Sequence, residues 1–410
     1  MKLLYIASVD FYTKPNPSYH LMSTMLEDVL NEGIEVLYVG CSEEGIEKHI
    51  PDFLENHPNF SYHLINCPKV EKSNFVSRYL YGIKYSREVG KYIKKHIQGC
   101  DVVFVQSSPT VLYTLCYARK LAKNRTIIYN VQDMFPGSSI ASGVMTRKWM
   151  QRIFYRLQKT AYKKADVITA ISEDMKIKLL EQGVPEEKIR VIVNWFDNST
   201  VREISWEDNR FVRKYNLNPD AFYVQYAGTM GYVFDYETVL KVADKLKEHR
   251  DIVFHMIGEG SQKEEFIQAT KNRGLDNIVF LPLEPQEMVS DVYSACSVCY
   301  IPLKKGIIGN SVPSKAGLLM ACKRAIITSV DKDSDYYRMI ENHAGIAADQ
   351  DNPDAIVEAI LYLKNNKSIC QVMGRRGYEY GHELYSRSNN MRTYIKLFKE
   401  CALNIDKKEN

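Results

Sequence analysis

Short apolar runs alternate with amphipathic stretches along almost the whole chain. This alternation is typical of β–α–β units, in which buried parallel strands are joined by helices that cover a sheet. In the first half, the expected strands are residues 3–9, 34–39, 62–65, 102–106, 126–130, 167–170 and 191–194. In the second half, they are residues 223–227, 252–257, 278–281, 298–302 and 325–328. The sequence therefore predicts an α/β protein with two doubly wound parallel sheets.

The alternation stops between Asn194 and Asp220, where the sequence is charged and irregular. A chain of 410 residues is long enough for two domains, each with its own core. We expect Rossmann-like domains at residues 1–200 and 201–375, and a last helix at 376–410 that packs back toward the N-terminal domain. Open α/β sheets bind ligands at the carboxyl ends of their strands, so we expect the two domains to face a central cleft.

The composition excludes several classes of protein. A hydrophobic share of 45% with 25% charged residues is typical of globular proteins. No run approaches the roughly 18 uncharged residues that span a bilayer, and the chain becomes polar too soon after Met1 for a secretory signal peptide. The nine cysteines lack metal-ligand spacing. Cys296 and Cys299 lie in an apolar, strand-like run, so we expect buried thiols in the reduced cytosol, and neither a metal nor a redox pair.

Basic residues gather in two parts of the first half. Residues 69–125 contain 12 Lys and Arg against three acidic residues. Residues 144–164 contain seven basic residues and no acid, with Trp149, Phe154 and Tyr155 among them. Such segments suit an anionic membrane surface, and a solvated helix face is the alternative. No nucleic-acid-binding module accompanies the charge, so nucleic acid is not an expected partner.

Residues 311–315 (Ser-Val-Pro-Ser-Lys) are the first candidate for binding a ligand. A small apolar run follows them and predicts a helix, so Ser314 and Lys315 would offer a hydroxyl, a cation and free backbone amides to a phosphate. Upstream, a strand-like run ends in a turn whose glycines let the backbone approach an anion. This turn consists of Gly228, Thr229, Met230 and Gly231. The alternatives are a helix cap with a solvated lysine, and a tight turn without a ligand.

Six motifs follow one another along the chain. They are residues 129–136 (Tyr-Asn-Val-Gln-Asp-Met-Phe-Pro), 170–173 (Ala-Ile-Ser-Glu), 194–197 (Asn-Trp-Phe-Asp), 226–231 (Tyr-Ala-Gly-Thr-Met-Gly), 257–260 (Ile-Gly-Glu-Gly) and 313–315 (Pro-Ser-Lys). In this order they resemble the retaining glycosyltransferases of the GT-B fold. Within that group they are most similar to the family 4 enzymes of bacterial surface polysaccharide assembly, on the fucosamine transferase branch. The resemblance covers nearly the whole chain.

The resemblance implies a donor and an acceptor, and no cofactor. The C-terminal domain would hold a nucleotide-sugar, with a UDP-sugar favoured, and the N-terminal domain a lipid-linked or growing glycan of a capsule, O-antigen or exopolysaccharide. Hexosyl or N-acetylhexosaminyl transfer would proceed with retention at the inner face of the plasma membrane, where a cytoplasmic protein would bind peripherally. No metal is expected, because Asp331, Asp333 and Asp335 lie in an expected loop.

The resemblance also implies roles for single residues. Lys315 would stabilise the charge that grows on the leaving diphosphate. Asp133, just after an expected strand, would position the acceptor hydroxyl or accept its proton, unless it is a turn residue. Further donor-site candidates are Gly228, Thr229, Met230 and Ser314 at the diphosphate, Gly258, Glu259 and Gly260 at the nucleoside, Ser334 and Asp335 at the sugar or ribose, and Asn310.

The chain departs from the family pattern at several places. Two glutamates that the broad family carries eight positions apart correspond to Asn310 and Leu318 here, although the polysaccharide branch often lacks one or both. A Gly-Gly turn after the first strand is replaced by residues 14–20, whose two prolines would present Ser18 and His20 to the acceptor. For His20, a helix start without a ligand is the alternative.

A further departure concerns the charge opposite the phosphates. The Arg and Lys that many relatives carry after the Gly228 turn are missing from residues 232–235. Phosphate neutralisation would then depend on Lys315, with Lys304 or Lys305.

Two other functions stay open, a sugar-nucleotide epimerase of the same fold and a non-catalytic subunit of glycan assembly. The basic, aromatic N-terminal segments argue against the epimerase, which needs no acceptor surface.

Overall fold

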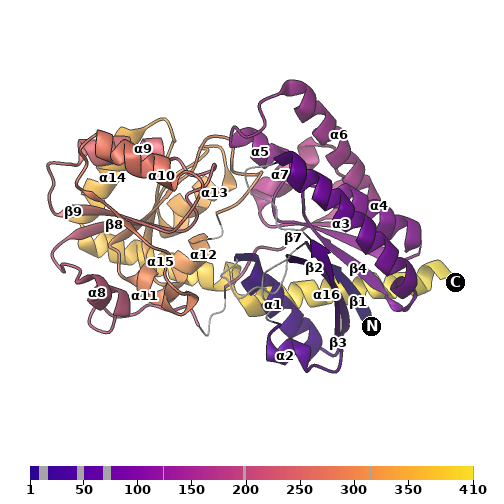
Figure 1. The fold of residues 1–410 in the computed structure, drawn as a ribbon. Coiled ribbons are helices and arrows are strands. Elements are labelled where there is room, and N and C mark those ends of the chain that lie inside the picture. Colours follow the sequence, from indigo (N-terminus) through magenta and orange to yellow (C-terminus); the bar gives the residue numbers. More distant parts are fainter. Residues whose placement is uncertain are drawn as a thin grey trace. The chain divides into compact units, whose positions relative to one another are not determined.

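The structure is a computed structural model that describes residues 1–8, 17–43, 50–67, 75–122, 124–196, 200–313 and 315–409. The side chains at positions 17, 18, 43, 75, 78 and 404–409 lie outside this description. The chain forms two compact units (Figure 1). Unit 1 consists of Met1–Ser138, Met145–Asn194 and Ser388–Asn410, and unit 2 of Ser139–Val144 and Trp195–Arg387.

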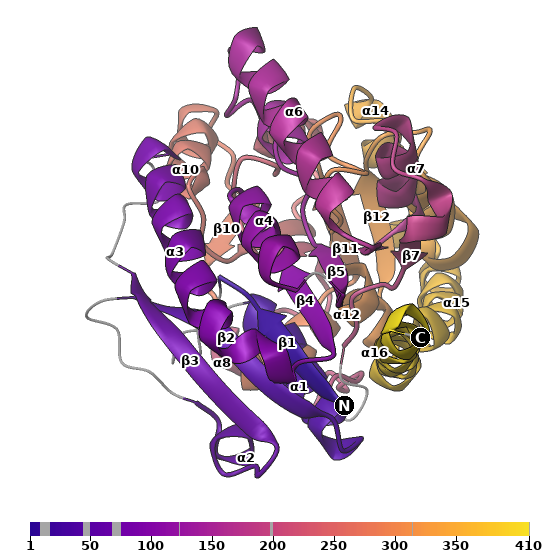
Figure 2. The same cartoon turned by 90° about the vertical axis from the view of Figure 1, so that its right-hand side faces the viewer.

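Unit 1 is built on a parallel sheet with the strand order β3-β2-β1-β4-β5-β6-β7 in the described part of the chain. Its strands are β1 (Lys2–Ile6), β2 (Glu35–Glu43), β3 (Phe60–Cys67), β4 (Val102–Gln106), β5 (Thr126–Val131), β6 (Val167–Ala170) and β7 (Ile189–Val191). Its helices are α1 (Pro17–Asn31), α2 (Asp52–Glu55), α3 (Phe75–His96), α4 (Val111–Leu121), α6 (Lys148–Lys164) and α7 (Glu173–Glu181), while α5 (Gly137–Ala141) has residues in both units. Helices α3, α4 and α6 lie side by side (Figure 2).

Unit 2 is built on a second parallel sheet, with the described order β10-β9-β8-β11-β12-β13. Its strands are β8 (Phe222–Ala227), β9 (Ile252–Ile257), β10 (Ile278–Leu281), β11 (Val298–Pro302), β12 (Ala325–Ser329) and β13 (Gly345–Ala348). Its helices are α8 (Arg210–Tyr215), α9 (Tyr236–Lys245), α10 (Lys263–Asn272), α11 (Val289–Ser294), α12 (Lys315–Ala321), α13 (Asp335–Met339), α14 (Pro353–Asn365) and α15 (Lys367–Leu384). The predicted α/β fold with two parallel sheets is therefore confirmed.

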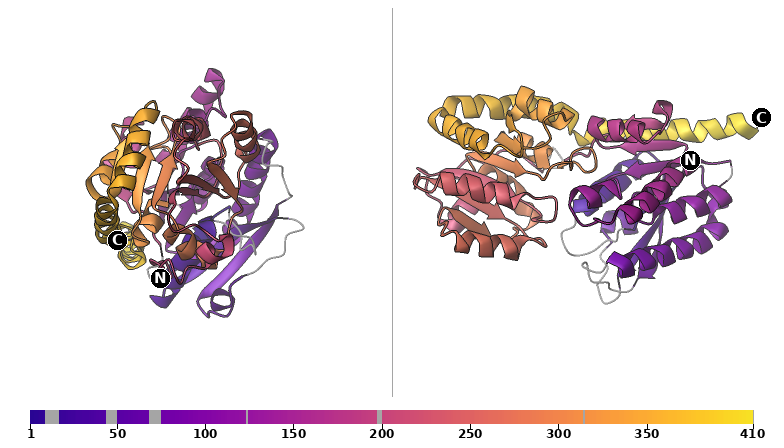
Figure 3. Two further views of the ribbon diagram at one scale, coloured as in Figure 1. Left: turned by 90° about the vertical axis from the view of Figure 1, so that its left-hand side faces the viewer. Right: turned by 90° about the horizontal axis from the view of Figure 1, so that it is seen from above.

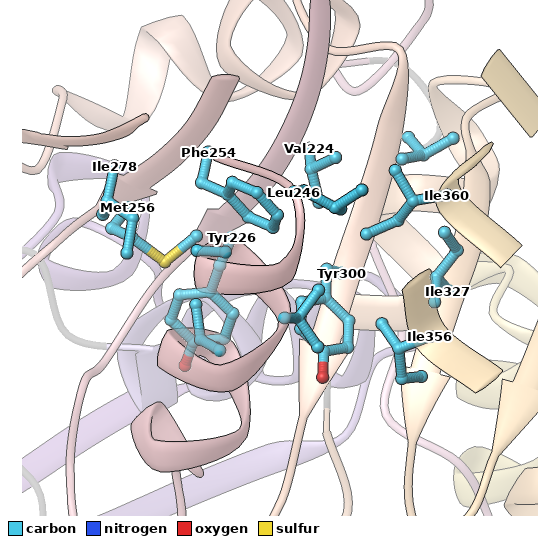
Figure 4. Packing of buried hydrophobic residues seen from close by; sticks show 14 of the residues in the cluster. Val224, Tyr226, Leu246, Phe254, Met256, Ile278, Tyr300, Ile327, Ile356 and Ile360 are labelled. Atoms are coloured by element: carbon cyan, nitrogen blue, oxygen red, sulfur yellow. The ribbon is translucent and has the colours of Figure 1, made fainter. Parts of the chain in front are cut away.

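The sheet of unit 2 is buried on both faces, as its continuous apolar strands require. Val224 and Tyr226 alternate along β8 toward one face, where they pack with Phe254 of β9 and Tyr300 of β11 (Figure 4). Tyr223 of β8 points to the opposite face and belongs to a second cluster. Because the strands are covered on both sides, only their ends are available to a ligand.

Two elements of unit 2 differ from the sequence prediction. Strand β13 was not predicted, since its Gly-Ile-Ala-Ala sequence carries little of the apolar bulk that marks a buried strand. Residues 194–220, read as an irregular connection, include α8. Asn209 caps α8, accepting hydrogen bonds from the backbone amides of Phe211 and Val212, and the Phe211 side chain is fully buried.

The last helical region is two helices, α15 and α16 (Arg387–Glu409), where the sequence predicted one last helix at 376–410. Helix α15 ends at Leu384, and the carbonyl of the next residue, Tyr385, accepts a hydrogen bond from the backbone amide of Phe196 at 3.1 Å. From Ser388 onward, α16 belongs to unit 1 (Figure 3). There Phe398 packs edge-on against Phe104 of β4, with ring centroids 5.5 Å apart.

Candidate functional site

Two glycine turns meet at the carboxyl ends of β8 and β9. The backbone amide of Gly228 donates to the Ile257 carbonyl at 2.8 Å, and that of Met230 donates to the Glu259 carbonyl at 2.9 Å. A Cβ atom at Gly258 would lie 2.1 Å from the Gly228 oxygen, and one at Gly260 would lie 2.2 Å from the Met230 oxygen. The two turns thus pack backbone to backbone, and only glycine fits at positions 258 and 260.

Lys315, the first residue of α12, places its amine against the first of these turns. A Cβ atom at Gly228 would lie 2.1 Å from Lys315 Nζ, so the amine occupies the space that any larger residue would fill. Gly228 also has a φ of 147°, a conformation that other residues rarely adopt. The amine lies 3.7 Å from the centroid of the Tyr226 ring. The structure therefore brings together Lys315 and the Gly228 turn, two features that lie far apart in the sequence.

The surroundings of Lys315 disfavour its charge. Burial lowers the pKa of the Lys315 amine to about 7, against which the nearby Cys299 thiol acts only weakly. Among the described residues, no carboxylate forms an ion pair with Lys315. A desolvated ammonium without a carboxylate partner is suited to pair with an anionic ligand, which would restore its charge.

The other residues of the first turn have different roles. The Thr229 carbonyl accepts a hydrogen bond from the Tyr226 hydroxyl at 2.7 Å. Met230 was predicted to line the site, but its side chain is fully buried in the core of unit 2. This prediction is wrong for the side chain, because the turn directs the apolar group inward. Only the backbone of Met230 remains for a ligand.

A second cation lies beside the paired turns. Gln262, just after the second turn, donates its backbone amide to the Met230 carbonyl at 3.0 Å. Its side-chain oxygen accepts a hydrogen bond from Lys304 Nζ at 3.5 Å. Lys305 instead pairs with exposed Asp351, at 3.5 Å. Of the two lysines that the sequence offered as extra phosphate partners, Lys304 therefore lies next to the turns. Glu259 is exposed and pairs with Lys263 at 2.7 Å.

The loop before α12 is held by its own side chains. Asn310 donates its side-chain amide to the Gly306 carbonyl at 2.9 Å. The backbone amide of Gly306 donates to Asp331 Oδ1 at 2.8 Å, an anchoring role that sequence reasoning missed. Leu318 packs against the apolar core of unit 2. Ser314, the predicted hydroxyl donor, lies outside the described residues.

Ser334 and Asp335 stand at the start of α13. The Ser334 hydroxyl accepts from the Tyr337 backbone amide at 3.0 Å and donates to the Asp331 carbonyl at 2.5 Å. Both bonds belong to a helix N-cap, so the prediction that this hydroxyl contacts a ligand is not supported by its geometry. Asp335 is exposed and lies 3.5 Å from Arg338 in an ion pair.

The acceptor-site candidates belong to unit 1. Asp133 is exposed and lies two residues beyond the end of β5. Its neighbour Gln132 is fixed on three sides: its backbone amide donates to Ser107 Oγ at 3.0 Å, its side-chain amide donates to Asn130 Oδ1 at 2.9 Å, and its side-chain oxygen accepts from Asn194 at 2.9 Å. This amide network, which sequence reasoning did not identify, holds the strand end that carries Asp133.

His20 and Ser18 lie in the first turn of α1. The His20 carbonyl accepts a hydrogen bond from Thr24 Oγ1 at 2.7 Å. The Ser18 side chain is outside the described residues.

Within the described part of the chain, no three His, Cys, Asp or Glu side chains gather in a way that could hold a metal ion. The described helices include none with the length and apolar character needed to cross a bilayer.

Comparison with known families decides the identity. Residues 26–200 match the family described as Glycosyltransferase Family 4, and residues 207–380 match the family described as Glycosyl transferases group 1. The chain is a family 4 glycosyltransferase. This family 4 glycosyltransferase is 21% identical to WcaI of Escherichia coli K12, named for colanic acid biosynthesis, over 67% of this chain and 68% of WcaI. It is 23% identical to the glycosyltransferase WbjE of Pseudomonas aeruginosa, over 69% of this chain and 71% of WbjE.

Solved structures share the fold of the family 4 glycosyltransferase. The sucrose-phosphate synthase of Thermosynechococcus elongatus matches with a TM-score of 0.74 and 15% identity, covering 97% of this chain and 98% of the synthase. HepE of Anabaena, solved in complex with UDP and glucose, matches with a TM-score of 0.72 and 13% identity, covering 98% of this chain and all of HepE. At these identities the matches show the GT-B fold alone, which is the fold that the sequence predicted.

Proposed function

We propose that this family 4 glycosyltransferase moves a sugar, with retention, from a UDP-sugar to a lipid-linked or growing glycan of a bacterial surface polysaccharide. One observation carries the donor half of the proposal. Lys315 as a whole is half-buried, but its amine lies against the Gly228 turn, where burial disfavours its charge and no described carboxylate pairs with it. A diphosphate at this turn would supply the missing negative charge.

The proposed chemistry follows from where charge develops. Breaking the glycosidic bond increases the negative charge on the leaving diphosphate, so a fixed ammonium stabilises the transition state more than the ground state. Lys315 is the residue that we place at the diphosphate, and Lys304 supports it from the other turn. In retaining transfer, an oxygen of the leaving phosphate can assist deprotonation of the acceptor. Asp133 then positions the acceptor hydroxyl in unit 1, together with Ser18 and His20.

The comparisons support the choice of donor and pathway. HepE, which shares the fold, has been solved with UDP and with UDP-glucose. WcaI, which shares sequence over two thirds of this chain, is named for colanic acid biosynthesis. A UDP-sugar donor and a surface glycan acceptor are therefore the first substrates to examine.

An exposed apolar face on unit 1 supports contact with a membrane. Trp149 and Ile153 lie one turn apart on α6 and are 60% and 45% exposed, while Val76 and Leu80 lie one turn apart on α3 and are 65% and 60% exposed. Helices α3 and α6 are in contact through the rings of Tyr79 and Phe154, whose centroids are 5.2 Å apart. We call these four residues the α3–α6 face.

The charge near this face suits anionic lipid. Helix α6 contains no acidic residue, and its basic residues are Lys148, Arg152, Arg156, Lys159, Lys163 and Lys164. Exposed apolar groups would insert at the headgroup level, while the basic groups would meet anionic headgroups. A solvated helix face explains the charge but not the exposed Trp149. We therefore propose that the protein acts peripherally at the cytoplasmic face of the membrane, where a lipid-linked acceptor is found.

The donor assignment is tested by ligand binding and by turnover. Thermal shift with a panel of UDP-, GDP- and TDP-sugars should identify the donor, because a ligand bound by the native state raises the unfolding temperature. With that donor, Lys315→Ala should lower turnover at least tenfold while the protein stays folded. Lys241→Ala, at an exposed position of α9 in the same unit, is the matched control and should retain turnover.

Donor fate separates the remaining functions. A transferase hydrolyses its donor slowly when no acceptor is present, an epimerase interconverts it, and a non-catalytic subunit leaves it unchanged. Unchanged turnover in Lys315→Ala would contradict the placement of the diphosphate at the Gly228 turn.

A further inference from the structure

Tyr226 lies between the core of unit 2 and the proposed diphosphate site. It is the penultimate residue of β8, two positions before Gly228, and its ring is packed in the apolar cluster of the sheet (Figure 4). The face of this ring lies 3.7 Å from the Lys315 amine. A cation within about 6 Å of an aromatic centroid is attracted by the negative face of the ring, and the attraction grows when water is excluded.

Few other groups compensate the charge of this amine. From β11, the Cys299 thiol approaches Lys315, but burial raises the pKa of that thiol well above its ordinary value and keeps it neutral. From β8, the Tyr226 phenol is also neutral, since burial raises its pKa above the usual range. Together with the absence of a carboxylate partner among the described residues, this leaves the ring face as the group that favours the ammonium.

The hydroxyl of the same residue acts on the turn itself. Tyr226 donates to the Thr229 carbonyl at 2.7 Å and so closes the turn that the Lys315 amine faces. One side chain therefore contacts both parts of the proposed site, the cation through its face and the backbone through its edge.

We propose that Tyr226 is a positioning residue for the nucleotide donor, whose ring face holds the Lys315 ammonium above the Gly228 turn and whose hydroxyl fixes the shape of that turn. The proposal rests on the proposed function, because a diphosphate donor is what the ammonium would meet. It adds a second residue to the site, one that never touches the ligand. Loss of the ring's negative face should therefore act through the protonation of Lys315.

The test compares two rings of the same shape. Tyr226→Phe removes the hydroxyl and keeps the negative face, whereas pentafluorophenylalanine at position 226, introduced by nonsense suppression, reverses the charge of the face in nearly the same volume. Trifluorophenylalanine at position 226 gives a ring face of intermediate charge. With three variants, the trend in the Lys315 pKa can still be followed if one of them fails to fold. Lysine 13Cε NMR follows the titration of Lys315 without a nucleotide, and the signal lost in Lys315→Met assigns it.

Three results are expected. The pKa of Lys315 should fall in the order Phe, trifluoro, pentafluoro, by about one unit over the series. UDP should then bind about tenfold more weakly to the pentafluoro variant than to the Phe variant at pH 8, where the amine must gain a proton on binding. At pH 5.5 the two variants should bind UDP with similar affinity, because Lys315 is charged in both.

The outcomes separate this inference from the proposed function. Equal Lys315 titrations across the series would overturn the role of Tyr226 even if UDP binds well. A graded titration in a protein that binds no UDP, GDP or TDP would support the ring contact as a fact of the fold and overturn its role in donor binding. A loss of UDP affinity that is the same at pH 5.5 and pH 8 would also overturn the role of Tyr226 in donor binding, since a purely structural defect would produce that result.

Discussion

At the scale of single residues, the buried amine of Lys315 should lower the free energy of unfolding. Its pKa is about 7 in the folded state and 10.5 when unperturbed, so the unfolded chain binds more protons between these values. The penalty is therefore greatest below pH 7 and decreases as the pH rises toward 10. Lys315→Met should raise the free energy of unfolding by roughly 2 kcal/mol at pH 6, and by less at pH 9.5.

Urea unfolding at several pH values measures this difference. Lys241→Met, at an exposed position of α9, is the control and should leave stability nearly unchanged. A Lys315→Met variant that is no more stable than the parent at pH 6 would show that the amine is well solvated. Its inactivity would then need another explanation than loss of a desolvated cation. A gain in stability with a loss of turnover is typical of a functional site.

The sequence allowed some of these residues to be predicted and not others. Lys315 and Gly228 stand in motifs whose chemistry is local, a lysine at a helix start and a glycine after a strand. Tyr226 reads from the sequence as one more aromatic residue of a buried strand, because its contact with Lys315 exists only once the chain is folded. Ser334 shows the opposite difficulty, since a hydroxyl that caps a helix looks the same in sequence as one that meets a ligand.

At the scale of elements, strands were predicted more accurately than the breaks between helices. The bounds of β4 and β9 agree with the predicted residues 102–106 and 252–257, because a strand buried on both faces is a continuous apolar run. At the break between α15 and α16, the Tyr385 carbonyl accepts a hydrogen bond from the backbone of Phe196, about 190 residues away. No local signal in the sequence marks such a contact.

The α3–α6 face gives a prediction about membrane binding. The double variant Trp149→Ser and Ile153→Ser should bind vesicles of anionic phospholipid at least fivefold more weakly, because it loses the apolar groups that would insert among the headgroups. Raising the salt concentration from 50 to 500 mM should also weaken binding by the parent protein, since the basic residues of α6 contribute through screened charges. Co-sedimentation with vesicles measures both effects.

Ile177→Ser on α7 is the control for the α3–α6 face, because Ile177 is as exposed as Ile153, at 45%. An equal loss of binding in this variant would show that removing any exposed apolar side chain weakens binding, wherever it lies. Vesicle binding that ignores ionic strength would contradict the role of the basic residues and leave only apolar docking.

At the scale of the whole molecule, two separate cores should unfold separately. Each unit has its own sheet and its own buried cluster, and α16 contributes to unit 1 although it is last in sequence. Phe398 of α16 is fully buried against Phe104, so Phe398→Ala should destabilise unit 1 by about 3–5 kcal/mol. Phe254→Ala, at an equally buried position of β9, should destabilise unit 2 by a similar amount.

Scanning calorimetry should therefore resolve two transitions that these variants move one at a time. A nucleotide donor at 100 times its Kd should stabilise the unit that carries Lys315 by about 2.7 kcal/mol and raise only the transition that Phe254→Ala lowers. The donor should not change the temperature of the transition that Phe398→Ala lowers, because the proposed donor contacts lie entirely in unit 2. If both variants and the donor shift one common transition, the units are not independent, and the binding energy of the donor is shared across the whole chain.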